Sequence, residues 1–129
     1  MPSLTAPMQD LHNSCENLTY KWRLKQLKQL RSMVKDHWDD WAKALSEDLG
    51  KHFTEAVCSE HLMVLTEIEM AIKKLKSWMK PESVPSPGIC FPAFTWLEKR
   101  PLTGPAVLII GPFNYPVALI LSPLVGALA

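Results

Sequence analysis

Apolar residues recur at helical spacing in two consecutive stretches of the chain. The first stripe begins at Tyr20, advances in steps of three and four residues to Leu49, and is followed by Gly50, a typical helix stop. Its charges oppose the helix dipole, because basic residues crowd the first half and acidic residues the second. We therefore expect tertiary packing to hold this helix, or a break near Val34 to divide it.

The second stripe predicts another amphipathic helix, from Thr54 as a candidate N-cap to Met79, with Pro81 ending it. Its apolar face is expected to contain Val57, His61, Leu65, Ile68, Ile72, Leu75 and Met79. Two antiparallel helices with a short connection are the simplest product. The pattern thus predicts a helical hairpin over residues 19–80, after a flexible, polar arm at residues 1–18.

The rest of the chain is first rich in proline and then continuously apolar. Residues 81–105 form a proline-rich connector, in which residues 91–98 suit a short edge strand. Residues 106–110 are apolar on both faces, as in a parallel strand buried between layers of helices. A tight loop follows, and Pro116 suits the first turn of a third helix.

Composition excludes some classes of protein, and the position of the charges adds a question. A net charge of +1 argues against a general nucleic-acid binder, and 47% hydrophobic residues exclude disorder over most of the length. Residues 21–35 hold six basic residues and no acid, which we interpret as a solvated helix face. Every charged residue lies at or before Arg100. The uncharged residues 101–129 must therefore be covered by further protein or by lipid.

If lipid covers this uncharged tail, the tail would be a membrane span. Residues 105–129 are long enough, since about 20 apolar residues cross a bilayer. However, Pro112 and Pro116 flank Asn114 in the middle of the run and indicate a turn there. The turn leaves a strand and a helix that are each too short to span, so the pattern argues against an anchor.

The cysteines and histidines raise the questions of compartment and metal. Cys15, Cys58 and Cys90 are odd in number and widely spaced, which indicates no disulfide framework. The first residues also lack the apolar core of a signal peptide, so we expect a cytoplasmic protein. His12 with Cys15, and Cys58 with His61, have the internal spacing of zinc ligands. The distance between the two pairs is arbitrary, so no metal site is predicted.

The loop and third helix carry a more specific signal. Residues 109–116 read Ile-Ile-Gly-Pro-Phe-Asn-Tyr-Pro, and this stretch resembles the aldehyde dehydrogenase superfamily, most closely its class 3, fatty-aldehyde branch. There the loop usually reads Gly-x-Trp-Asn-Tyr-Pro. The resemblance extends back in one register over most of the chain, through residues 67–69, Glu60 and residues 48–51.

The resemblance implies a fold. In that family an N-terminal helical pair packs on a doubly wound α/β cofactor domain, and a β-hairpin before the first cofactor strand contributes to dimer contacts. Residues 91–100 would belong to that hairpin, and residues 106–129 would be the start of the cofactor-binding domain. The chain is therefore expected to be mostly α, with a helical hairpin followed by the first strand, loop and helix of that domain.

The resemblance also implies site residues. The family asparagine that donates a hydrogen bond to the oxyanion falls on Asn114, and Gly111, Pro112 and Phe113 would line the nicotinamide and ribose end of NAD or NADP. The catalytic cysteine, the general-base glutamate and the glycine-containing cofactor loop of the family have no counterpart in this sequence. One oxyanion donor contributes about 3–4 kcal/mol, whereas enzymes lower barriers by at least about 8 kcal/mol.

We therefore expect an N-terminal part of an aldehyde-oxidising dehydrogenase that is inactive by itself. The resemblance implies an aldehyde as substrate, and either a homo-oligomer or a full-length subunit as partner. The alternative is a non-enzymatic helical-hairpin protein, either with a C-terminal membrane anchor or docked on a larger dehydrogenase chain.

Overall fold

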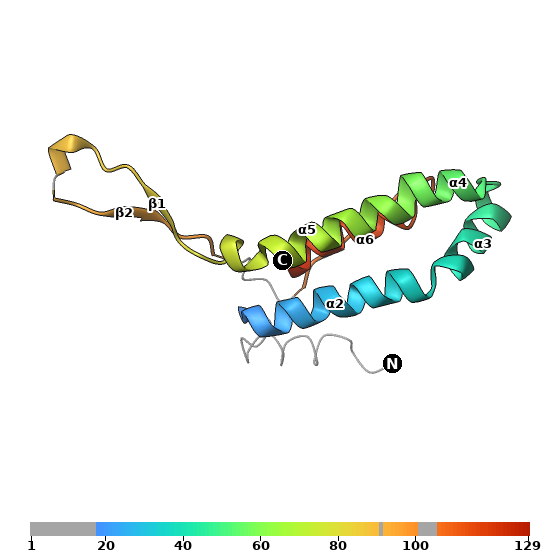
Figure 1. Ribbon diagram of the computed structural model, residues 1–129. Coiled ribbons are helices and arrows are strands. Elements are labelled where there is room, and N and C mark those ends of the chain that lie inside the picture. Colours follow the sequence, from blue (N-terminus) through green and yellow to red (C-terminus); the bar gives the residue numbers. More distant parts are fainter. Residues whose placement is uncertain (1–17, 91, 101–105) are drawn as a thin grey trace.

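A computed structural model describes residues 18–90, 92–100 and 106–129. Figure 1 shows two helical arms running antiparallel, a further helix beside the second arm, and a hairpin that extends beyond one end. The elements are α2 (Tyr20–Asp36), α3 (Trp38–Leu49), α4 (Phe53–Ala56), a π-helical turn (Val57–His61), α5 (Leu62–Trp78), β1 (Glu82–Val84), a 3-10 turn (Gly88–Cys90), β2 (Thr95–Leu97) and α6 (Ala118–Leu128). The predicted mostly helical fold is confirmed.

The first arm is divided, as the charge pattern allowed. Thr19 caps α2, since its side-chain oxygen accepts a hydrogen bond from the Trp22 amide at 3.2 Å. The helical path breaks at His37 and resumes in α3. Gly50 ends α3 with a φ of 64°, the left-handed conformation that glycine adopts without strain. The break is therefore close to Val34, and the predicted stop at Gly50 is confirmed.

The second arm begins one residue before the predicted cap. The cap is His52, whose Nδ1 accepts a hydrogen bond from the Thr54 amide at 3.2 Å, so the prediction of Thr54 as N-cap was wrong. The imidazole accepts the hydrogen bond of the Thr54 amide, which has no partner within the helix because it lies in the first turn. α5 ends at Trp78, before Pro81.

The main core lies where α2, α5 and α6 meet. Its buried side chains come from all three helices: Leu27, Leu30, Val34, Val64, Ile68, Ala71, Leu75, Ala118 and Val125. Arg23 of α2 adds a polar link, because its guanidinium donates to the carbonyl oxygen of Ala129 at 2.7 Å. A second cluster joins α3 to the start of the other arm through Trp38, Ala42, Leu45 and Ala56.

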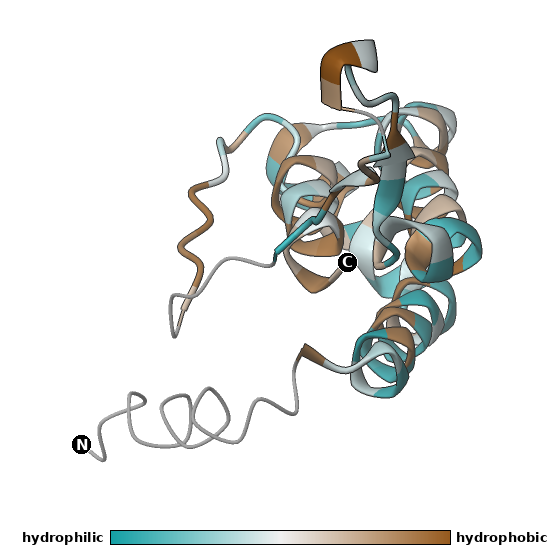
Figure 2. Ribbon diagram, turned by 90° about the vertical axis from the view of Figure 1, so that its left-hand side faces the viewer, coloured by the Kyte–Doolittle hydropathy of each residue, from teal (hydrophilic) through white to brown (hydrophobic). Residues whose placement is uncertain are grey.

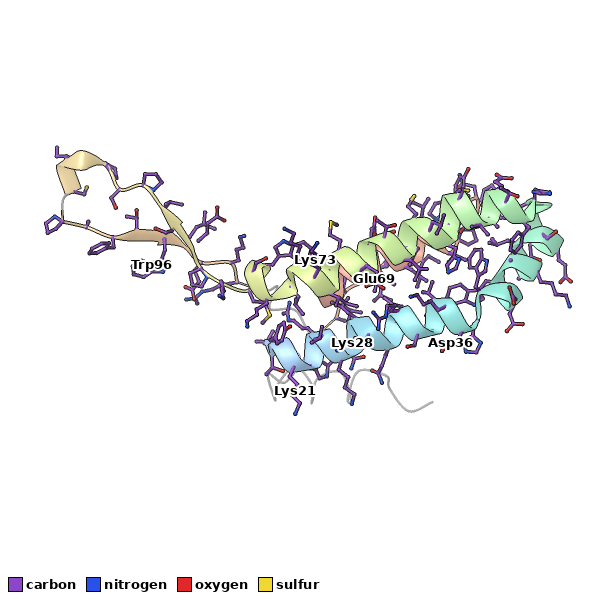
Figure 3. The ribbon with its side chains drawn as sticks, viewed as in Figure 1. Lys21, Lys28, Asp36, Glu69, Lys73 and Trp96 are labelled. Carbon is purple, nitrogen blue, oxygen red and sulfur yellow. The ribbon has the colours of Figure 1, made fainter. Side chains whose placement is uncertain are left out.

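Apart from Arg23, the basic residues of α2 lie outside this core. Lys21, Lys25 and Lys28 are exposed, and Figure 3 shows Lys21 extending away from α5. Further along, Arg31 and Lys35 lie 3.4 and 3.8 Å from Glu69 of α5. The basic stretch is thus a solvated face, as predicted.

The proline-rich connector contains a β-hairpin. β1 and β2 pair antiparallel, with Ser83 opposite Trp96. The second strand is shorter than the predicted residues 91–98, and Phe91 lies outside the described residues. Trp96 is exposed and lies on the hairpin well away from the helices (Figure 3).

Residues 106–110 differ from the expectation of a buried strand. They form no strand, and Leu108 and Ile110 are 83% and 84% exposed. Figure 2 shows this apolar segment apart from the packed helices. The reason is pairing: a strand forms only against a neighbour, and the sheet within the described part of the chain consists of β1 and β2 alone.

The third helix is short. α6 starts at Ala118, two residues after the predicted Pro116, and runs through Pro123. Among the described residues, no helix combines the length and apolar character that crossing a membrane requires.

Candidate functional site

The predicted site residues lie in the loop that leads into α6. Pro112, Phe113 and Asn114 are exposed, with Asn114 in a turn and the Phe113 ring 83% exposed. Gly111 is half-buried against α6, where an added Cβ would lie 2.3 Å from Cγ1 of Ile120. A larger residue at position 111 would therefore force the Ile120 side chain to move. The loop presents an aromatic ring and an amide to the outside while its base packs on α6.

A buried carboxylate holds the C-terminal side of this loop. Glu60 belongs to the π-helical turn and is 0% exposed. Its Oε2 accepts hydrogen bonds from the backbone N–H groups of Val117 at 2.8 Å and of Ala118 at 3.2 Å. Val117 at the N-cap position has no side-chain hydrogen bond, so Glu60 supplies the missing cap from 57 residues away.

Lys51 completes the anchor. Its side chain is 8% exposed and forms an ion pair with Oε1 of Glu60. The same ammonium lies 3.8 Å from the ring centroid of Tyr115, a cation–π distance. Lys51 directly follows the glycine that ends α3, and Tyr115 directly follows Asn114. One buried ion pair therefore joins the C-terminal end of α3, the π-helical turn and the loop that contains Asn114.

Sequence reasoning assigned no role to Lys51 or Glu60, although both lie in the stretches that resemble the dehydrogenase family. The buried face of the second arm contains Ala56, Glu60, Val64, Ile68, Ala71 and Leu75. The predicted stripe shares Ile68 and Leu75 with this face. From Val57 to Ile72, each of its other residues lies one position after the residue that is buried. If the stripe had been placed on this face, its one acidic residue would have singled out Glu60.

A cavity of about 430 Å³ lies between α3 and the loop. It is lined by Trp41, Ala44, Leu45, Asp48, Leu49, Phe113, Pro116 and Val117. Asp48 is the one charged residue among those that line it. Phe113 thus borders both the exposed loop surface and an apolar hollow.

Of the two candidate pairs of metal ligands, the structure describes only Cys58 and His61. His12 and Cys15 lie outside the described residues, and Cys58 is an exposed free thiol. The His61 ring instead stacks on Trp38, with ring centroids 4.0 Å apart. Within residues 18–90, 92–100 and 106–129, no three histidine, cysteine or acidic side chains form a metal-binding group.

His61 should make the stability of the fold depend on pH. Burial lowers its pKa below the ordinary 6.5, and the charge of Lys35 lowers it further. The unfolded chain therefore binds a proton at higher pH than the folded chain, so stability falls as pH drops below 6.5 toward the lowered pKa. Urea titrations between about pH 7.5 and pH 5 should show this loss. His61→Phe should flatten it, and an unchanged slope in that variant would contradict the assignment.

The family model described as "Aldehyde dehydrogenase family" matches residues 5–129, and therefore includes both arms, the hairpin and the Asn114 loop. The chain belongs to the aldehyde dehydrogenase family. Its relatives include members of family 3, which confirms the branch that the loop sequence indicated.

Three similar proteins indicate how much of a dehydrogenase the chain matches. "Aldehyde dehydrogenase family 3 comG" of Dictyostelium discoideum is 44% identical over 84% of this chain and 23% of its own length. The dog protein "Aldehyde dehydrogenase, dimeric NADP-preferring" is 39% identical over 91% of this chain and 25% of its own length. A structure of Staphylococcus aureus AldH in a substrate-bound state superposes with a TM-score of 0.84 at 36% identity, over 94% of this chain and 26% of that one. The chain thus spans about a quarter of the length of these relatives.

Proposed function

We propose that this chain forms part of an NAD(P)-dependent enzyme that oxidises aldehydes to carboxylic acids, with Asn114 as oxyanion donor. The observation that carries the proposal is the family match over residues 5–129, which includes the loop with Asn114. Because the chain spans about a quarter of its relatives, the complete activity is proposed for an assembled dehydrogenase. We expect the 129-residue chain by itself to reduce no NAD(P).

The environment of Asn114 suits this role. A side-chain amide donates two hydrogen bonds, and it stabilises negative charge on a carbonyl oxygen when a nucleophile adds to the aldehyde. Asn114 is exposed in its turn, so its amide is accessible to a substrate. The next residues are fixed by Lys51 and Glu60, which limits the movement of the donor.

The same loop fits one end of a nicotinamide cofactor. The exposed ring of Phe113 offers a flat apolar surface, and Pro112 and Gly111 add little bulk beside it. Residues 106–129 contain no lysine or arginine, so this segment offers no cationic side chain to the phosphates. When bound, the cofactor supplies the hydride acceptor for the oxidation. The dog relative is named as preferring NADP, which supports NAD or NADP as the proposed cofactor.

The dog relative is also named as dimeric, which favours a homo-oligomer or a complex with a full-length subunit for this chain. The hairpin of β1 and β2 is a suitable contact surface, because it extends beyond the helices with Trp96 exposed (Figure 1). A cytoplasmic location stays a prediction from the sequence.

A chimera tests the proposed role of Asn114. The 129 residues replace the matching quarter of Staphylococcus aureus AldH, and aldehyde-dependent NAD(P)H formation is followed by absorbance. We expect an active chimera in which Asn114→Ala lowers kcat by about 10²–10³, the effect of losing one oxyanion donor. Asn13→Ala, in the N-terminal arm predicted from the sequence, is the matched control. Full activity of the Asn114→Ala chimera would refute the assignment.

A further inference from the structure

We infer that Lys51 and Glu60 are positioning residues, which orient Asn114 by fixing the loop on both sides of Pro116. The inference rests on the proposed role of Asn114. It goes beyond that role because it assigns a task to two residues on the helical arms, in a different part of the chain from the loop.

The first argument is the geometry of the contacts. Lys51 holds the ring of Tyr115, one residue after Asn114, and Glu60 holds the amides of Val117 and Ala118. These contacts fix three of the four residues that follow Asn114. The Asn114 side chain itself stays exposed. The anchor therefore holds the backbone next to the donor without covering the donor.

The second argument is energetic. Removing two charges from water carries a large desolvation penalty, and an apolar pair of similar volume is often as stable. Burial of Lys51 and Glu60 is therefore poorly explained by stability alone. An apolar pair could not accept the two N–H groups at the start of α6, nor attract the Tyr115 ring electrostatically. The ion pair does both.

The third argument is where the carboxylate comes from. The π-helical turn of residues 57–61 places Glu60 on the same buried face as Ala56 and Val64. π-helical turns inside α-helices often occur at functional sites. Here the turn directs a charged side chain through the core to the N-terminus of α6, where the helix dipole favours a negative charge.

The decisive variant is Lys51→Met/Glu60→Leu, which replaces both charges by apolar groups. A purely structural pair predicts a folded protein with normal activity. If the pair positions the loop, the variant folds, but the backbone around Val117 and Ala118 is more mobile. The matched control is Lys43→Met/Glu47→Leu, which makes the same changes in an exposed pair on α3. If the first variant does not fold, Lys51→Met/Glu60→Gln is used instead, because it also leaves no buried charge and keeps the side-chain shape at position 60.

Amide hydrogen exchange on the 129-residue chain measures the loop directly. We expect the Val117 and Ala118 amides to exchange about 10–100-fold faster in Lys51→Met/Glu60→Leu, because each loses its bond to a charged acceptor. Core amides of α2 and α5 should be unchanged, as should all amides in the control. Unchanged exchange at Val117 and Ala118 overturns the inference.

Kinetics of the chimera measure the consequence. We expect Lys51→Met/Glu60→Leu to lower kcat about 100-fold with little change in KM, since a misplaced donor acts mainly in the transition state. In the Asn114→Ala background the same variant should cause no further loss. An equal loss in both backgrounds, or normal kcat, overturns the inference. If Asn114→Ala alone leaves kcat unchanged, the proposed function fails, and hydrogen exchange then decides whether the anchor exists.

Discussion

Replacing Lys51 alone with methionine is expected to lower the free energy of unfolding by about 3–5 kcal/mol. The substitution leaves the Glu60 carboxylate fully buried with two backbone N–H groups as its remaining partners. It also removes the cation from the ring of Tyr115. An uncompensated buried charge costs much more than the pair contributes, because the charge keeps its desolvation penalty and loses its counter-charge. Urea unfolding followed by tryptophan fluorescence measures the change.

The control for this prediction is Lys43→Met. Lys43 pairs with Glu47 at 3.8 Å on the exposed side of α3, where ion pairs contribute about 0–1 kcal/mol. Lys51→Met/Glu60→Leu should recover much of the stability lost in Lys51→Met, since no charge then remains buried. Equal stability of Lys51→Met and Lys43→Met would contradict the burial of the ion pair.

The helical arms could be predicted because their signals are local. The apolar stripe, the left-handed residue at Gly50 and the stop before Pro81 each depend on neighbours within a turn or two. The opposed charges also gave a break near Val34 as one of two alternatives, the other being a single helix held by tertiary packing. The exact break at His37 was beyond this reasoning, since it depends on packing of the Trp38 cluster against the other arm.

The buried face of the second arm was predicted only in part, for a physical reason. Regular helical spacing cannot anticipate a π-helical turn, which adds a residue to the turn and changes the register of the side chains. The stripe was therefore placed on His61, whose neighbour Glu60 is the buried residue. The contact of Glu60 with Val117 spans 57 positions and has no local signal.

The strand expected at residues 106–110 is absent, although the local composition favoured it. Its composition is that of a strand covered on both faces, yet pairing depends on a neighbour that no local pattern supplies. Exposed residues such as Leu108 and Ile110 are the result. The loop after it was recognised only by its resemblance to a family, because an asparagine between prolines is common in turns. Chemistry alone would have left Asn114 as a structural residue.

Leu75→Ala is expected to lower the free energy of unfolding by about 2–5 kcal/mol. Leu75 is 0% exposed in α5 and belongs to the core formed with α2 and α6. The substitution removes buried methyl groups and leaves a cavity that the surrounding helices only partly fill. Leu62→Ala is the matched control, because it makes the same change in the same helix at a side chain that is 50% exposed. There the effect should stay within about 0.5 kcal/mol. Urea unfolding midpoints compare the two, and similar losses would show that α5 does not pack through the face that presents Leu75.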